Sequence, residues 1–389
     1  MDNIPAPITT TADLTALCDR LSQHDYIAID TEFMRETTYY SKICLIQLAS
    51  SAEAASVDPL ADGLDLTPLY ALMRDASTLK VFHAGRQDLE IFVHMMGELP
   101  TPCYDTQIAA MVCGFGDQVG YDKLVQGFLE IGIDKGSRFT DWSQRPLTDK
   151  QIHYALNDVI YLEQIYPMMR DKIETAGRSA WLTEEMAVHA DLSIYQVDAN
   201  QVWRKIKQRG NKPAALNRLK FLAAWREREA QRRDVPKSRL IKDDTLVAIA
   251  LGNPSSNDAL GRIRGFPGGG NGKLLPEIMR IITKANDAPK DEWPTIPDAP
   301  TRRPSPAVVD MLRLVLKHVT DSNGIAPRLI ANADDLDQIA LGNLDQVKAM
   351  KGWRYDIFGK IAEDVKKGRL AITIKGKSTK LIPVPEDDD

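Results

Sequence analysis

The sequence lacks the features that mark membrane, secreted and zinc-binding proteins. It has no run of about 18 apolar residues that could span a bilayer. Its first residues, MDNIPAPITT, have neither the basic nor the apolar region of a signal peptide. The four cysteines form no CxxC pair and have no histidine at zinc spacing: Cys18, Cys44, Cys103 and Cys113. We therefore expect free thiols and a cytoplasmic protein with no membrane partner.

Cations are scarce in residues 1–200, and acids are scarce in the segment 201–242. Residues 1–200 carry 14 Lys and Arg against 30 Asp and Glu, a net charge of −16. Residues 201–242 carry 14 cations against 3 acids, a net charge of +11. A basic segment beside an acidic domain indicates a polyanionic partner held next to a carboxylate-rich site that uses cations.

At 389 residues the chain is long enough for two or three domains. Short apolar, β-branched runs predict strands at 26–32, 43–49 and 79–85, and CYDTQIAAMVC predicts a strand that runs into a helix. Residues 147–169 predict a long helix, with Thr148 as its N-cap and Pro167 near its end. Alternating strands and helices favour an α/β domain over residues 1–195.

The second half of the chain reads as two helical blocks, 208–288 and 305–377. Six prolines lie in 287–306, so we expect an extended linker at 289–304. KDDTLVAIALGNP is echoed about 90 residues later by NADDLDQIALGNL, which predicts a duplicated small helical domain. Residues 378–389 are expected to be an acidic tail.

Carboxylates give the sequence its strongest chemical signal. Asp30 and Glu32 stand two residues apart on the first predicted strand, so they point to the same face. Two acids so close repel one another unless a cation lies between them, and hard oxygen ligands suit Mg²⁺ or Mn²⁺. Asp88 and Asp158 lie in the same acidic domain. Each acid alone has a plain explanation as a helix cap or a solvated charge.

Several motifs, in order along nearly the whole chain, resemble the ribonuclease D family of the DEDD exonuclease superfamily. They are AIDTEFMRETTYYSKICLIQLAS, VFHAGRQDLEIF, YDTQIAAM, DWSQRPLTDKQIHYALNDVIYL and VPKSRLIKDDTL. The resemblance implies a ribonuclease-H-like exonuclease domain, with a mixed sheet flanked by helices, followed by two small all-α HRDC-like domains.

The resemblance also implies a function and its residues. Asp30 and Glu32 match the first family motif, Asp88 matches the second, and Tyr154 with Asp158 matches the third. Such enzymes remove nucleoside 5′-monophosphates from RNA 3′ ends and are associated with transfer-RNA maturation, so tRNA precursors with 3′ extensions are the expected partner. Two Mg²⁺ or Mn²⁺ ions, roughly 3.5–4 Å apart, would clamp the scissile phosphate.

The stretch IHYALND leaves two candidates beside Asp158. Residues four apart on a helix share a face, which sets Tyr154 beside Asp158 and turns His153 away. The His-type members of the superfamily keep that histidine on a loop before the helix, so spacing alone leaves the choice open. The resemblance favours Tyr154, whose phenol would orient the attacking water.

Further candidates would contact RNA. The basic segment begins with cations suited to phosphates, and two residues adjoin the acidic motifs: Arg204, Lys205, Lys207 and Arg209, with Phe33 and His83. The plain alternatives are a solvated helix face for the cations and a packed strand residue for His83. Two other functions remain open, an exonuclease acting on DNA and an inactive RNA-binding scaffold. The sequence predicts no oligomeric state.

Overall fold

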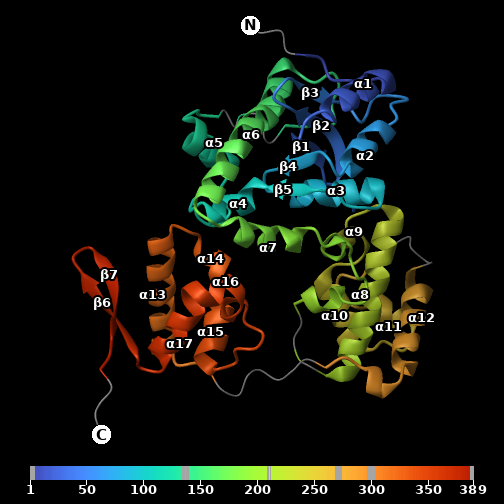
Figure 1. Ribbon diagram of the computed structural model, residues 1–389. Helices are drawn as coiled ribbons and strands as arrows, with labels where there is room; N and C mark the ends of the chain where they lie inside the picture. The colour runs from blue at the N-terminus through green and yellow to red at the C-terminus, as the bar shows by residue number, and fades with distance from the viewer. Residues whose placement is uncertain are drawn as a thin grey trace.

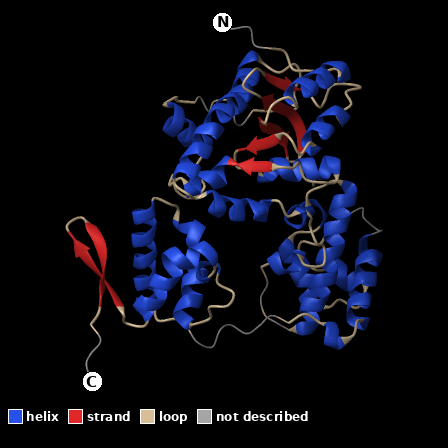
Figure 2. Ribbon diagram, viewed as in Figure 1, coloured by secondary structure: helices blue, strands red, loops and turns tan. Residues whose placement is uncertain are grey.

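The computed structural model describes residues 5–133, 136, 140–207, 210, 212–267, 274–295 and 303–385. Figure 1 shows an α/β N-terminal domain above two separate helical domains, and Figure 2 shows that strands are confined to the N-terminal domain and one C-terminal hairpin. No helix within these described ranges is long and apolar enough to cross a membrane.

A five-stranded mixed sheet forms the centre of the N-terminal domain. Its strands are β1 (Tyr26–Met34), β2 (Lys42–Ala49), β3 (Ala54–Val57), β4 (Leu79–Phe82) and β5 (Cys103–Asp105). They lie in the order β3-β2-β1-β4-β5. β1 pairs antiparallel with β2 and parallel with β4, so β1 is the central strand. The prediction of a mixed sheet flanked by helices is confirmed.

Helices cover both faces of this sheet. They are α1 (Thr11–Leu21), α2 (Thr67–Arg74), α3 (Arg86–Met96), α4 (Thr106–Val112), α5 (Tyr121–Leu129), α6 (Asp149–Thr175) and α7 (Ser179–His189). Ile27 and Ile29 of β1 share a buried cluster with leucines of α1, α2 and α3. Ala28 points the other way and packs with Val159 and Leu162 of α6. The alternation of β1 therefore assigns each side chain to one face.

Helix α6 begins as predicted. The Thr148 side chain accepts a hydrogen bond from the backbone N–H of Gln151, and the Gln151 side-chain oxygen accepts one from the backbone N–H of Thr148, which completes a capping box. The helix ends later than expected, because it passes through Pro167 and continues to Thr175. Its apolar stripe against the sheet holds the helix together beyond the proline.

The helical domains consist of short helices around one long helix each. The first comprises η2 (Val202–Lys205), α8 (Pro213–Arg233), α9 (Lys237–Leu240), α10 (Asp243–Gly252), α11 (Asn257–Gly261) and α12 (Leu274–Asp287). The second comprises α13 (Pro306–Asn323), α14 (Pro327–Ile330), α15 (Ala333–Leu341), η4 (Lys348–Met350), α16 (Gly352–Arg354), η5 (Tyr355–Gly359) and α17 (Lys360–Lys366). η1 (Leu192–Tyr195) joins the N-terminal domain to the first.

Three boundaries differ from the sequence expectations. Trp203 and Ile206 belong to the core of the first helical domain, although they precede residue 208, because their side chains pack against α8 and its neighbours. η3 (Lys290–Glu292) is a short helical turn inside the segment expected to be extended. The expected acidic tail begins instead with β7 (Ser378–Pro383), which pairs with β6 (Leu370–Lys375) in a hairpin.

Both helical domains dock on the N-terminal domain. In the second, Arg354 is fully buried and its guanidinium pairs with Glu184 and Glu185 of α7. The Trp181 and Trp353 rings stack beside this pair, 4.3 Å between centroids. In the first, Asp234 after α8 holds the loop that follows β1 through hydrogen bonds to its backbone. One helical domain therefore lies at each end of α7 (Figure 1).

Candidate active site

The end of β1 places two carboxylates on one face of the sheet. Asp30 and Glu32 share the face of β1 that Ala28 turns toward α6, and the register with β2 shifts immediately after Glu32. This irregularity interrupts the pairing locally, and β1 then continues to pair with β2 through Phe33 and Met34. Asp30 lines a cavity of about 280 Å³ together with Asp158 and Tyr154 of α6.

Asp158 completes a cluster with these two acids. One carboxylate oxygen from each of Asp30, Glu32 and Asp158 lies within 4.8 Å of the others, and all three residues are half-buried. They come from a strand and a helix that are far apart in sequence, and the apolar contact between β1 and α6 brings them together.

The fourth acid approaches from the opposite side of β1. Asp88 lies in the first turn of α3, is 7% exposed, and accepts a hydrogen bond from the Thr31 hydroxyl. Thr31 follows Asp30 and points to the α3 face. Asp88 is close enough to Asp30 for its charge to raise the pKa of Asp30. The structure therefore gathers all four predicted acids.

A strained turn sets the position of Asp88. Between β4 and α3, Ala84 has φ 54°, a left-handed conformation unusual for alanine. At Gly85, a side-chain carbon would lie 2.5 Å from Cβ of Phe82, so only glycine fits. The buried Asp105 carboxylate accepts hydrogen bonds from the backbone N–H groups of Ala84 and Gly85, at 3.0 and 2.9 Å. Asp105 thus holds the turn in place.

Tyr154 and His153 have different environments. Tyr154 is half-buried and lines the cavity, with its ring 6.2 Å from that of Trp142. His153 is exposed and does not line the cavity. Tyr154 and Asp158 are one helical turn apart in α6 and line the same cavity. His153 already lies inside helix α6. In the His-type members of the superfamily, by contrast, the histidine is expected on a loop before the helix.

The acids repel one another strongly. Desolvation raises the pKa of Asp30 well above its ordinary value, and the charges of Asp88, Asp158 and Glu32 raise it further. Burial raises the pKa of Asp88 to about 6, although its hydrogen bond from Thr31 opposes the change. Carboxylates gathered in this way resist carrying their full charge together unless a cation neutralises them.

This cluster fits a hard divalent cation. Asp30, Glu32 and Asp158 offer oxygen ligands within reach of one ion, and oxygen is the donor that Mg²⁺ and Mn²⁺ prefer. Asp88 adds a fourth carboxylate next to Asp30. Burial raises the pKa of both Asp30 and Asp88, and neighbouring acids raise the pKa of Asp30 further, so a bound cation would favour the ionised carboxylates.

Other residues around the cavity were not predicted. The Tyr121 hydroxyl donates to the backbone oxygens of Asp158 and Asn157, at 2.6 and 3.2 Å, and so fixes the part of α6 that carries the acid. Gln107 and Asp122 also line the cavity. Gln107 lies in the motif YDTQIAAM, whereas Tyr121 and Asp122 lie in none of the quoted motifs, and only the folded arrangement places all three at the cavity.

The two RNA-contact candidates beside the acids are both half-buried. His83 lines the cavity, and its ring nitrogens bond to the Thr106 hydroxyl at 3.0 Å and to the Val119 carbonyl at 3.2 Å. Burial lowers the pKa of His83, so the ring is neutral at physiological pH. Phe33 follows Glu32 at the end of β1 and is half-buried.

The basic candidates lie away from the acids. Arg204 is exposed, donates to Gln201 at 2.8 Å and covers the Trp203 ring. Lys205 lines a second cavity between the N-terminal and first helical domains, and Lys207 is exposed nearby. Arg209 lies outside the described residues.

Comparisons with known proteins agree with this arrangement. Residues 5–174 match the family described as 3′-5′ exonuclease, and residues 215–282 match the HRDC domain. Ribonuclease D of Granulibacter bethesdensis is 43% identical over 381 residues, which cover 97% of this chain and 96% of the relative. Ribonuclease D of Zymomonas mobilis is 45% identical over 375 residues, covering 95% and 96%.

A solved structure has the same architecture. Escherichia coli RNase D, described as an exoribonuclease involved in structured RNA processing, superimposes with a TM-score of 0.80 at 29% identity. The match covers 94% of this chain and 99% of that one. Together with the full-length relatives, it shows that the chain belongs to the ribonuclease D family and carries a 3′-5′ exonuclease domain.

Proposed function

We propose that the protein is a divalent-metal-dependent 3′–5′ exoribonuclease that releases nucleoside 5′-monophosphates from RNA 3′ ends by hydrolysis. The observation that carries the proposal is the cluster of Asp30, Glu32 and Asp158, with Asp88 close enough to act on Asp30 and with Tyr154 lining the same cavity as Asp30 and Asp158. These are the five positions that match the family motifs. A purely structural role does not account for four mutually repelling acids.

The acids would hold the metal. Asp30, Glu32 and Asp158 share one site through their clustered oxygens, and Asp88 adds its carboxylate beside Asp30. When bound, Mg²⁺ or Mn²⁺ lowers the pKa of water and neutralises charge that develops on the phosphate. We propose a two-ion site for these four acids.

Tyr154 would position the attacking water. A phenol has an ordinary pKa near 10 and is a poor base at neutral pH, so its part is to hydrogen-bond the water and keep it in line with the phosphorus. The Tyr121 hydroxyl donates a hydrogen bond to the Asp158 carbonyl and so fixes the position of this part of α6. Neutral His83, held by Thr106 and Val119, forms part of the cavity wall that faces the terminal nucleotide.

The substrate would be an RNA with a single-stranded 3′ extension, and tRNA precursors fit this class. Phe33 lies next to the acids and offers an aromatic ring to a base, while Arg204, Lys205 and Lys207 offer charge to phosphates. We also propose that the second helical domain is HRDC-like, because α14 and α15 follow α13 as α9 and α10 follow α8. The free cysteines suit a cytoplasmic enzyme.

Digestion of matched RNA and DNA tests the function. A 5′-labelled single-stranded RNA and its DNA counterpart are incubated with the protein in Mg²⁺, in Mn²⁺ and in EDTA. We expect RNA to shorten one nucleotide at a time and EDTA to stop the reaction. Faster degradation of DNA would make the protein a DNA exonuclease. RNA binding without shortening in either metal would make it a scaffold.

A further inference from the structure

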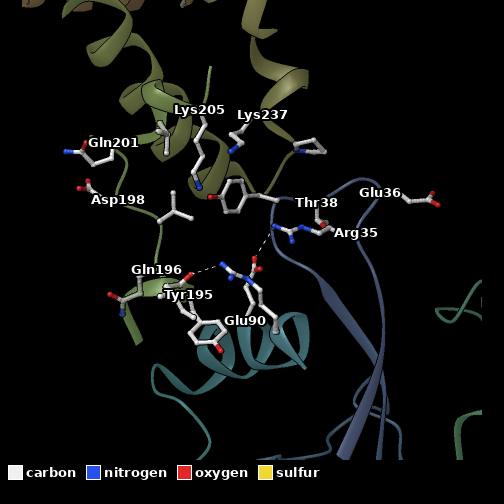
Figure 3. Close-up of a pocket in the computed structure, with 16 residues that line it drawn as sticks. Arg35, Glu36, Thr38, Glu90, Tyr195, Gln196, Asp198, Gln201, Lys205 and Lys237 are labelled. Atoms are coloured by element: carbon white, nitrogen blue, oxygen red, sulfur yellow. Dashed lines mark hydrogen bonds and ion pairs between the residues drawn. The ribbon is translucent and has the colours of Figure 1, made fainter. Parts of the chain in front are cut away.

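A second cavity lies between the N-terminal domain and the first helical domain. It measures about 540 Å³, and no motif points to it. One wall is formed by residues 35–39 after β1 and by the start of α3. The other is formed by residues 194–205 and by Lys237 at the start of α9. Figure 3 shows side chains from both domains converging on this space.

Cations reach the cavity from both walls. Arg35 and Arg86 come from the N-terminal domain, and Lys205 and Lys237 come from the helical domain; all four line the cavity. Figure 3 shows Lys205 and Lys237 extending from one side and Arg35 from the other. Such an arrangement suits an anion that lies between the two domains.

Neighbouring acids form ion pairs with two of the four cations. Arg35 pairs with Glu90 at 3.1 Å, and Lys237 pairs with the buried Glu227 at 3.1 Å. Arg86 donates to the Ile194 carbonyl at 3.4 Å. Lys205 has no ion-pair partner among the residues that the structure describes. Two further acids, Glu36 and Asp198, line the cavity. Lys205 and Arg86 are therefore the cations best placed to accept a phosphate.

Two cations that line the cavity lie close in sequence to the proposed catalytic carboxylates. Arg35 follows Glu32 by three residues, which corresponds to roughly 10 Å of extended strand. Arg86 lies two residues before Asp88 in the first turn of α3. A strand of RNA whose 3′ end lies at the acids can therefore reach these cations with the nucleotides that come before it.

Contacts between the two domains hold the walls of the cavity in place before a ligand binds. The Asp234 carboxylate accepts hydrogen bonds from the backbone N–H groups of Tyr39 and Tyr40, both at 3.0 Å. The Tyr39 hydroxyl donates to Glu227, whose side chain is 1% exposed. These bonds fix the loop after β1 against the end of α8. A preorganised site loses less entropy when it binds its ligand.

The remaining lining suits bases. Tyr39 contributes an aromatic ring to the wall, and Val197, which is 48% exposed, contributes an aliphatic surface. Cations combined with aromatic and aliphatic surface are the usual means of binding a single strand without sequence preference. A volume of about 540 Å³ is that of a small-ligand site, so it accommodates a nucleotide or two of a single strand and excludes a duplex.

We propose that this cavity is the subsite for the single-stranded RNA backbone upstream of the nucleotide being removed, with Arg86 and Lys205 each contacting a phosphate. The inference rests on the proposed exoribonuclease function and extends it. The N-terminal 200 residues carry a net charge of −16, so an incoming polyanion needs cations that offset this repulsion close to the acids.

Substrate length provides the test. Cleavage of 5′-labelled RNAs from two to ten nucleotides is measured in Mg²⁺ for the unmodified protein and for the Arg86→Gln/Lys205→Gln double variant. In the unmodified protein, kcat/KM should rise with length and level off beyond about four nucleotides. In the double variant, the ratio of kcat/KM for the decamer to that for the dinucleotide should fall roughly tenfold.

Salt dependence and a matched control complete the experiment. Because the double variant removes two cations that bind phosphates, the slope of log affinity against log salt for the decamer should become shallower by about 1.4. Lys284→Gln removes one positive charge from an exposed position on α12, outside this cavity, and should keep both the ratio and the slope.

The outcomes distinguish a failure of the subsite proposal from a failure of the proposed exoribonuclease function. Equal losses on the dinucleotide and the decamer, no loss on either, or the same loss with Lys284→Gln would overturn the subsite and leave the exoribonuclease intact. Cleavage by the unmodified protein that does not depend on RNA length would do the same. If the unmodified protein cleaved no RNA of any length, the proposed function itself would be wrong.

Discussion

Replacing Asp88 with asparagine should stabilise the metal-free protein while it removes activity. Asp88 is 7% exposed, and burial raises its pKa from 3.8 to about 6. A carboxyl whose pKa moves by that amount makes the folded state about 3 kcal/mol less stable when it is ionised. The amide of asparagine avoids this cost and can still accept the hydrogen bond from Thr31. We therefore expect a gain of at most about 3 kcal/mol at pH 8.

The gain should depend on pH in a defined direction. The folded protein holds the Asp88 proton more tightly than the unfolded chain does, so acidification stabilises the unmodified protein between about pH 6 and 3.8. The advantage of Asp88→Asn should therefore shrink as the pH falls through 6 and nearly vanish at about pH 4. Activity in Mg²⁺ should be lost at every pH.

Local unfolding is the appropriate assay, since a chain of several domains does not unfold in one step. Hydrogen exchange of peptides from β1 and α3, followed by mass spectrometry in EDTA, reports the free energy of opening around the site. Peptides from α13 in the second helical domain serve as an internal control. A variant that is less stable than the unmodified protein at pH 8 would refute the reasoning. So would an equal gain at pH 8 and pH 4.

Three further predictions concern single side chains. Tyr154→Phe should lower kcat about 100-fold or more, because it removes the hydroxyl that orients water. His153 is exposed, so His153→Ala should not change kcat. The reverse ranking of the two variants in an RNA-trimming assay would exchange the roles of these residues. Gly85→Ala should destabilise the protein by roughly 1–3 kcal/mol, because the added carbon would lie 2.5 Å from a neighbouring side chain; an unchanged melting temperature would contradict this. Arg354→Ala removes the fully buried guanidinium that pairs with Glu184 and Glu185 and leaves Glu185 with Lys348 as its ion-pair partner, which should cost about 1–3 kcal/mol and release the second helical domain. An unchanged radius of gyration in small-angle scattering would refute that role.

Local periodicity was sufficient to predict the elements that carry the acids. The two-residue spacing of Asp30 and Glu32 put both on one face of a strand, and the four-residue spacing of Tyr154 and Asp158 put both on one side of α6. In the structure Tyr154 lines the cavity and His153 does not. These placements depend only on backbone geometry, which sequence spacing reveals.

The supporting residues depend on contacts between distant parts of the chain. Asp105 holds the turn before Asp88, and Tyr121 holds the backbone of Asp158; Asp105 lies in the motif YDTQIAAM, but nothing in the sequence showed which residues these two would contact. The pairing of Tyr39 with Glu227 joins residues 188 positions apart. The β7 strand was missed because its apolar residues are few and mixed with polar ones. Only packing reveals such partners.

The central claim is that the clustered carboxylates form one metal site, and crystals soaked in Mn²⁺ test it most directly. An anomalous difference map should show manganese in contact with Asp30, Glu32 and Asp158, with Asp88 beside it, and the same peak should disappear in Asp30→Asn. Manganese bound elsewhere on the protein, or a site that persists unchanged in Asp30→Asn, would contradict the account.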